Sequence, residues 1–161
     1  MAALLKRHQP SQSLATNLLA GIGGFLAIFV LYHLTQWSGY LLWMAPFGAS
    51  CVLLFALPQS PLSQPINVIG GHLVSTAIGL VVRYYLPDAG WSMALGVGLA
   101  IGAMAILRIT HPPAGADPLV VYVESPDWSY LVFPVGLGSA VLVALAYNYH
   151  RVLTGRPYPL Q

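Results

Sequence analysis

Long apolar runs separated by short polar interruptions make up most of the chain. Four of them approach the roughly 20 apolar residues that a helix needs to cross the hydrocarbon core of a membrane. These runs cover residues 14–34, 65–85, 91–109 and 128–149. Trp and Tyr side chains lie near their ends, as side chains at a membrane interface do. The pattern predicts four membrane-spanning helices.

Two further apolar stretches are interrupted by proline and glycine. One covers residues 40–57, and the other, residues 110–123, is too short to cross a membrane as a continuous helix. A shift of 67 residues aligns the two stretches and the spans that follow them. The aligned pairs are Pro46 with Pro113, Gly48 with Gly115, Ala49 with Ala116, Ser50 with Asp117 and Gly71 with Gly138. The chain therefore has the pattern of two copies of one unit: helix, broken segment, helix.

We therefore expect an all-α integral membrane protein with a single membrane domain, residues 1–161. Four transmembrane helices and two re-entrant half-helix segments would form two tandem repeats, at about residues 14–86 and 91–150. The alternative is that both broken segments cross fully, which gives six spans and inverted units. The distribution of basic residues fits both arrangements. The shortness of residues 110–123 favours four spans.

The composition supports a membrane location. Hydrophobic residues make up 57% of the chain and charged residues only 6%, whereas about a quarter of a soluble domain is charged. No Lys, Arg, Asp or Glu occurs from His8 to Val82. Basic residues precede the first span and follow the last, which predicts that both termini are cytoplasmic. They form no cluster that could follow a phosphate backbone, so no nucleic-acid partner is expected.

The broken segments point to an anion. Pro112 disfavours helical backbone at His111, and Asp117 is a preferred N-cap residue for a new helix. The matching half-helix is expected to begin at Ser50. Helix starts carry free N–H groups and a positive dipole end. Paired half-helix starts at membrane depth are a recurrent way to bind anions.

These two segments carry a resemblance to a known family. The octapeptide HPPAGADP at residues 111–118 resembles the signature of the HPP family of small integral membrane proteins, and APFGAS at residues 45–50 resembles that family's other glycine-containing segment. The resemblance covers roughly residues 14–149. Similar family members are associated with nitrite transport in cyanobacteria and plastids. The resemblance thus implies passage of a small monovalent anion, with nitrite as the lead, in a bacterial (cyanobacterial) cytoplasmic membrane.

The candidate substrate-binding residues lie in the broken segments and beside them. They are Gly48, Ala49, Ser50, His72, Arg108, His111, Gly115, Ala116 and Asp117. Backbone N–H groups and the Ser50 hydroxyl would donate hydrogen bonds to the anion. The two aligned glycines would allow it to approach the backbone closely.

Four of these side chains have a second interpretation. Asp117 is favoured as a helix cap, and the alternative is a titrating group that couples the anion to a proton. Arg108 would concentrate anions or stabilise the end of its own helix. His111 would bind the anion, shuttle a proton or lock the turn with a hydrogen bond. His72 would line a pore or hydrogen-bond between helices.

Other classes of function have less support. The chain has no H-x-x-H or H-E-x-x-H pair for a metal, and only four acidic residues. We expect no enzyme activity and no cofactor; a hydrolase in which His72 approaches Ser50 in space is the weak exception. A non-transporting scaffold or regulatory subunit is the alternative, but it leaves the two matched breaks unexplained. Since four helices enclose a narrow bundle, a homo-oligomer is expected.

Overall fold

The computed structural model describes residues 5–160, and every regular element in that range is helical. Six α-helices form the framework: α1 (Leu14–Ser38), α2 (Ala45–Cys51), α3 (Pro65–Tyr85), α4 (Gly90–Ile106), α5 (Asp117–Glu124) and α6 (Leu137–Tyr149). Short 3-10 or π-helical pieces extend or join them: η2 (Val52–Ala56), η3 (Pro61–Ser63), η4 (Pro112–Ala116), η5 (Trp128–Leu131), η6 (Val132–Gly136) and η7 (His150–Thr154). The all-α prediction is confirmed.

Within the described residues, three helices are long and apolar enough to cross a membrane. They are Leu14–Ser38, Pro65–Tyr85 and the continuous run Trp128–Thr154, which contains α6. The fourth predicted span, residues 91–109, corresponds to α4, which has 17 residues and ends at Ile106. Two residues later the backbone of Arg108 takes a left-handed φ of 60°, which helical backbone does not permit. The helix is therefore shorter than its apolar pattern suggests.

α1 is longer than the pattern predicts. Its expected end was at residue 34, where polar residues begin, but the helix continues to Ser38. The hydroxyls of Thr35 and Ser38 donate to the carbonyls of Leu31 and Leu34 one turn earlier, so the polar side chains are satisfied within the helix. Gly39 then ends the helix with a φ of 75°, a conformation that glycine adopts without strain.

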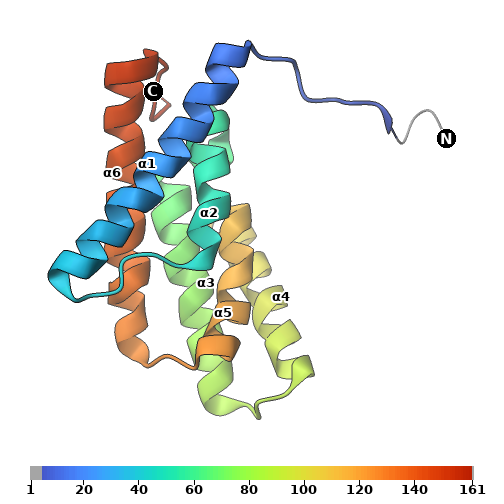
Figure 1. Ribbon diagram of the computed structural model, residues 1–161. Helices are drawn as coiled ribbons and strands as arrows, with labels where there is room; N and C mark the ends of the chain where they lie inside the picture. Colours follow the sequence, from blue (N-terminus) through green and yellow to red (C-terminus); the bar gives the residue numbers. More distant parts are fainter. Residues whose placement is uncertain (1–4, 161) are drawn as a thin grey trace.

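The helices form a bundle in which the two units run in opposite directions. α1 and α3 descend in Figure 1, and α6 ascends, so the chain enters and leaves the bundle at the same end. The half-helices α2 and α5 point in opposite directions from neighbouring starts (Figure 1). Four spans with two re-entrant segments would require α1 and α3 to be antiparallel. The helix directions instead match the alternative arrangement, in which the units are inverted.

Two aligned glycines make this inverted packing possible. A Cβ on Gly71 of α3 would lie 2.8 Å from the Cβ of His111, in the broken segment of the second unit. A Cβ on Gly138 of α6 would overlap the Leu42 carbonyl oxygen and lie 2.8 Å from the Phe47 ring, in the first unit. Each glycine thus gives room to the broken segment of the other unit. The 67-residue alignment therefore has a structural counterpart at these two positions.

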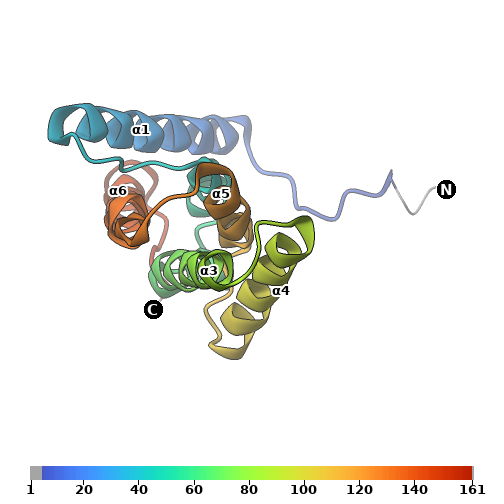
Figure 2. The same cartoon turned by 90° about the horizontal axis from the view of Figure 1, so that it is seen from below.

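α3 is the central helix and α1 the peripheral one. α3 packs against α4, α5 and α6, whereas α1 lies across α6 and the α2–η2 segment (Figure 2). α1 buries a single ridge, Gly23, Ala27 and Leu31, with the four-residue spacing of one helix face. Beside this ridge Ala20, Ile28 and Leu34 are half-buried against the core. The remaining face is apolar and exposed, as expected for a helix that faces lipid or another subunit.

The first half-helix begins earlier than predicted. α2 starts at Ala45, with Pro46 in its first turn, so Ser50 is an interior position and not the N-cap. Proline is favoured at this place because its fixed φ suits the helix and its missing N–H is not needed there. The backbone N–H of Ser50 is consequently inside the helix and not free for an anion. The predicted start at Ser50 is wrong.

Candidate functional site

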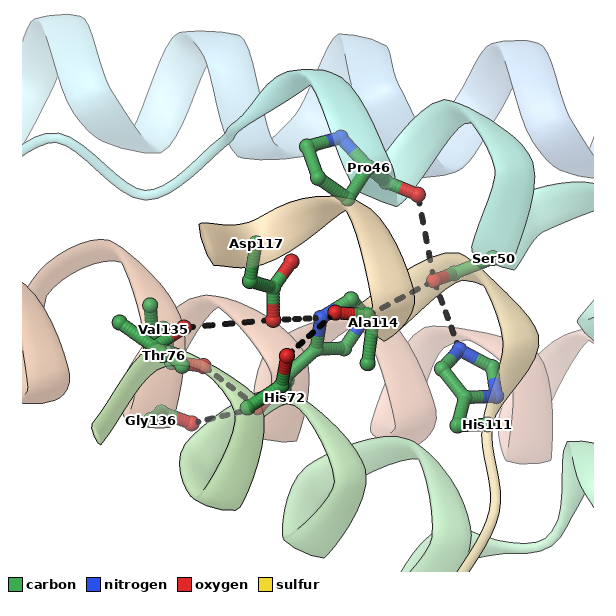
Figure 3. A network of polar contacts seen from close by, with 11 residues as sticks. Pro46, Ser50, His72, Thr76, His111, Ala114, Asp117, Val135 and Gly136 are labelled. Carbon is green, nitrogen blue, oxygen red and sulfur yellow. Dashed lines mark hydrogen bonds and ion pairs between the residues drawn. The ribbon is translucent and has the colours of Figure 1, made fainter. Parts of the chain in front are cut away.

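Four buried polar side chains meet between the two half-helices. Ser50 Oγ lies 2.9 Å from Nε2 of His72 and 2.8 Å from Nε2 of His111. The other ring nitrogen of His72, Nδ1, lies 2.9 Å from Oδ2 of Asp117. Ser50, His72 and His111 have no exposed surface, and Asp117 has 1%. We call these four residues the polar cluster; Figure 3 shows their side chains converging.

The polar cluster draws on both units of the chain. Ser50 projects from α2 and His72 from α3, whereas His111 precedes η4 and Asp117 begins α5. His72 lies seven residues from the start of its 21-residue helix, or about 10 Å along the axis at 1.5 Å per residue. A set of groups this deep in an apolar bundle is costly unless its members are paired. The cluster is therefore a specific feature of the fold and not a surface detail.

Side chains of α3 hold the second broken segment in place. Asn67 Nδ2 donates to the Thr110 carbonyl at 3.0 Å, and Ser75 Oγ donates to the Ala114 carbonyl at 2.6 Å. Thr76 Oγ1, one turn after His72, donates to Oδ2 of Asp117 at 3.2 Å. The first two bonds satisfy carbonyls that the broken helix leaves free. They fix the backbone on either side of His111, and the Thr76 bond holds the Asp117 carboxylate against α3.

His111 is anchored from its far side. Its Nδ1 lies 2.8 Å from the carbonyl oxygen of Leu62 in η3, which joins α2 to α3. The rings of His111 and His72 are 5.0 Å apart, and the Phe47 ring packs edge-on against His72 at 5.1 Å. Both imidazoles are thus held by packing as well as by hydrogen bonds.

Asp117 is not a helix cap. The residue before it, Ala116, occupies the cap position of α5, and no side chain caps that helix. The Asp117 carboxylate turns instead toward His72 and Thr76, and its second oxygen, Oδ1, is buried with no hydrogen-bond partner among the described residues. The sequence favoured the cap because it could not show that α3 supplies two donors. The preferred interpretation of Asp117 was wrong.

The two helix starts offer few free backbone donors. Pro46 lies in the first turn of α2, and Pro112 and Pro113 begin η4. Proline has no backbone N–H to donate. The N–H groups that follow are already used, since Phe47 donates to the Met44 carbonyl and Ala114 to the His111 carbonyl. The side chains of the polar cluster, and not bare amides, are therefore the main polar groups at this place.

The smaller predicted residues lie around the polar cluster and not within it. Ala49 and Ala116 line an open apolar groove of about 700 Å³ between α2 and the η4–α5 segment. Gly48 is exposed on α2. A Cβ on Gly48 or on Gly115 would meet no atom within 4 Å. The packing of the protein itself therefore does not require glycine at either position, and the close approach of a ligand to them stays a prediction.

Arg108 lies away from the polar cluster. Its side chain is exposed, and within the described residues it forms no side-chain hydrogen bond or ion pair. Its spacing from His111 suggested a shared helix face, but α4 ends before either residue. The prediction that Arg108 contributes to the site is not supported by this geometry. Thr76 and Ser75 were missed, although Thr76 follows His72 at the helical spacing of four.

The order Ser50, His72, Asp117 is that of a hydrolase triad, in which serine is the nucleophile and histidine the base. Two features separate this cluster from such a site. The Ser50 hydroxyl is fully buried, and a second histidine lies against it. A nucleophile needs space beside its oxygen for the substrate. The arrangement is better suited to exchanging protons among its own members. No group of metal-binding side chains was found in residues 5–160.

Comparison with known proteins agrees with the membrane character of the bundle. The sequence model of a family described as "HPP, transmembrane region" matches residues 9–159. Two proteins of Dictyostelium discoideum, both described only as transmembrane proteins, are 32% identical to the chain over 151 residues. The alignments cover 86% and 88% of this chain, and 49% and 53% of the relatives. The chain thus spans about half the length of the curated relatives it matches. No solved structure matches it.

Proposed function

The chain belongs to the HPP family of transmembrane proteins, and from that premise we propose that it transports a small monovalent anion, with nitrite as the first candidate. The observation that carries the proposal is the polar cluster, which is fully buried within an apolar helical bundle. Ionisable residues inside a membrane domain characteristically mark the pathway of an ion or a proton. A purely structural role would be served as well by apolar packing.

The groove between the half-helices provides the approach for the anion. Its wall includes Ala49 and Ala116, which immediately precede Ser50 and Asp117 in the chain. The polar cluster therefore lies directly behind the groove wall. Small side chains in this groove wall would let an ion pass with modest rearrangement, and a weak site is what conduction requires.

The charges of the polar cluster suit a weakly held anion. Asp117 alone would repel an anion, but His72 pairs with it at 2.9 Å. The two histidines can each present an N–H to a ligand that displaces the Ser50 hydroxyl. The site would thus offer directional donors without a strong excess of positive charge, and the ion could leave again.

The orientation and assembly of the protein form part of the proposal. The start of α1 and the end of the helical run that contains α6 lie at one end of the bundle (Figure 1), and the basic residues of the flanking sequence favour the cytoplasmic face for that end. The membrane would be the cytoplasmic membrane of a bacterium of cyanobacterial type. The exposed face of α1, with Phe25 at 64% and Trp37 at 86% exposure, suits contact with a second copy.

Anion flux into liposomes that hold the purified protein tests the function. Nitrite, nitrate, formate and chloride are compared, with protein-free liposomes as the baseline for passive entry of nitrous acid. We expect protein-dependent nitrite flux that His72→Gln abolishes. His150→Gln is the matched control, since His150 is also buried but bonds to the Leu54 carbonyl and Thr154. Flux of none of the four anions would favour the scaffold alternative.

A further inference from the structure

We propose that the polar cluster is a binding site for one exchangeable proton, which the Ser50 hydroxyl relays between His72 and His111. Coupling of this proton to the anion rests on the proposed function, whereas the proton site itself does not. The proposal follows from counting the hydrogens that the observed contacts require. Each contact needs one hydrogen between its two heavy atoms.

Two of the hydrogens are fixed by chemistry. The Leu62 carbonyl can only accept, so Nδ1 of His111 carries a hydrogen at their 2.8 Å contact. The Ser50 hydroxyl has a single hydrogen, yet Ser50 Oγ contacts Nε2 of both histidines at 2.8 and 2.9 Å. Ser50 can donate to only one of them. The other histidine must therefore donate from its Nε2 to Ser50 Oγ.

Every assignment that satisfies these contacts contains an additional proton. If Ser50 donates to His72, His111 carries hydrogens on both ring nitrogens and is a cation. If Ser50 donates to His111, His72 carries a hydrogen on Nε2. Its contact with Asp117 then needs one more, either on Nδ1 or on the carboxyl group. If Ser50 instead donates to the Pro46 carbonyl at 3.4 Å, both histidines donate to Oγ and the cluster holds two additional protons.

The additional proton has a physical rationale. Without it the cluster would hold two neutral histidines and an ionised Asp117, a net negative charge with no exposed surface to solvate it. With it the cluster is neutral overall. Burying an unbalanced charge costs far more than burying a paired one. Oδ1 of Asp117 has no hydrogen-bond partner among the described residues, which makes an unbalanced negative charge on this carboxylate still more costly.

The relay is a balanced shift of two hydrogens. His111 transfers its Nε2 hydrogen to Ser50 Oγ while the original Ser50 hydrogen passes to Nε2 of His72. One N–H and one O–H bond break, and one O–H and one N–H bond form. The positive charge moves from His111 to His72, next to Asp117. Ser50 again carries one hydrogen, now donated to His111, so the step needs no other reactant, and rotation of the hydroxyl restores the starting direction.

The ionisable groups around the polar cluster, among the described residues, make no contact that would take this proton from it. On α2 the neighbouring Cys51 faces Gly24 of α1 and not the histidines. The hydroxyl of Tyr130 in η5 donates to Glu124 at 3.1 Å and not to the polar cluster. The two ion pairs found among the described residues are His72 with Asp117 and Arg83 with Asp88. The cluster therefore has no partner cation that would replace the proton.

The proton site is tested directly on the full chain in detergent, without transport. Histidine is labelled with ¹⁵N, and His72→Gln and His111→Gln identify the resonances of the polar cluster. At neutral pH we expect either an imidazolium resonance from one of these histidines or an infrared C=O band of a protonated carboxyl group that Asp117→Asn removes. Two neutral histidines beside an ionised Asp117 would overturn the proposal.

The relay and its coupling are tested by proton movement in proteoliposomes that contain a pH-sensitive dye. A nitrite gradient should drive protons across with the wild-type protein. Ser50→Ala should reduce this proton flux by about 100-fold, the usual contribution of a positioned proton-transfer group. Ser139→Ala, which removes an equally buried hydroxyl bonded only to its own helix, should not.

The outcomes separate this inference from the proposed function. Wild-type nitrite flux without proton movement would overturn the coupling and leave anion transport standing. Unchanged proton flux in Ser50→Ala would overturn the relay. Absence of any anion flux would refute the proposed function, and the resonance measurement would still decide whether the proton site exists.

Discussion

At Gly138 the packing between the two units leaves no room for a side chain. Replacing it with alanine would place a Cβ against the Leu42 carbonyl oxygen and 2.8 Å from the Phe47 ring. Overpacking of this kind costs roughly 1–3 kcal/mol, and a backbone carbonyl cannot rotate away as a flexible side chain can, so the upper end applies. Alanine recovers about 1 kcal/mol through its higher helix propensity. The net expectation for Gly138→Ala is a loss of about 2 kcal/mol, roughly a 30-fold change in the ratio of folded to unfolded protein.

Gly115→Ala is the matched control. It lies in the aligned broken segment, but its Cβ would meet no atom within 4 Å, and its φ is not left-handed. Its stability should stay within about 0.5 kcal/mol of the wild type. Unfolding of both variants in mixed detergent micelles, followed by circular dichroism during a denaturing-detergent titration, measures the difference. Equal stability of Gly138→Ala and wild type, or equal loss in both variants, would refute the close approach of the units.

Three further predictions concern the site and its surroundings. Gly71→Ala should displace His111, because its Cβ would lie 2.8 Å from that residue's Cβ; nitrite flux should fall while the helical content stays, and unchanged flux would contradict the packing. Arg108→Gln should leave flux unaltered, since its exposed side chain has no partner among the described residues; a large loss in the liposome assay would restore its predicted role. Hydrogen bonds from the Ser129 hydroxyl and backbone N–H lower the pKa of Asp127 below its ordinary value of 3.8. The ionised carboxylate should therefore stabilise the fold above pH 3.8, and this contribution should be lost as the pH falls through the lowered pKa. Asp127→Asn should therefore reduce the melting temperature at neutral pH but not in strong acid, and an equal reduction at both would count against this hydrogen bonding.

The local features of this protein could be predicted from sequence because they depend on neighbouring residues. The long apolar runs identify α1, α3 and the run that contains α6 as membrane-spanning helices. Pro112 predicts the break that precedes η4, although α4 already ends at Ile106, and Pro118 marks the start of α5. The internal alignment picked out two members of the polar cluster, Ser50 and Asp117, without showing that His72 bridges them.

What only the tertiary structure decided is how the two units face each other. Ser50 and His111 are 61 residues apart in the chain, and His72 and Asp117 are 45 apart. Their contacts arise because α3 carries His72 and Thr76 into the gap between opposed half-helices. Local residue preferences predicted that Asp117 caps a helix and that Ser50 begins one. The earlier start of α2 has a local cause, because Pro46 suits the first turn of a helix. The cap at Asp117 was overridden by the tertiary packing, because a buried carboxylate gains more from the imidazole and hydroxyl of α3 than from the start of its own helix.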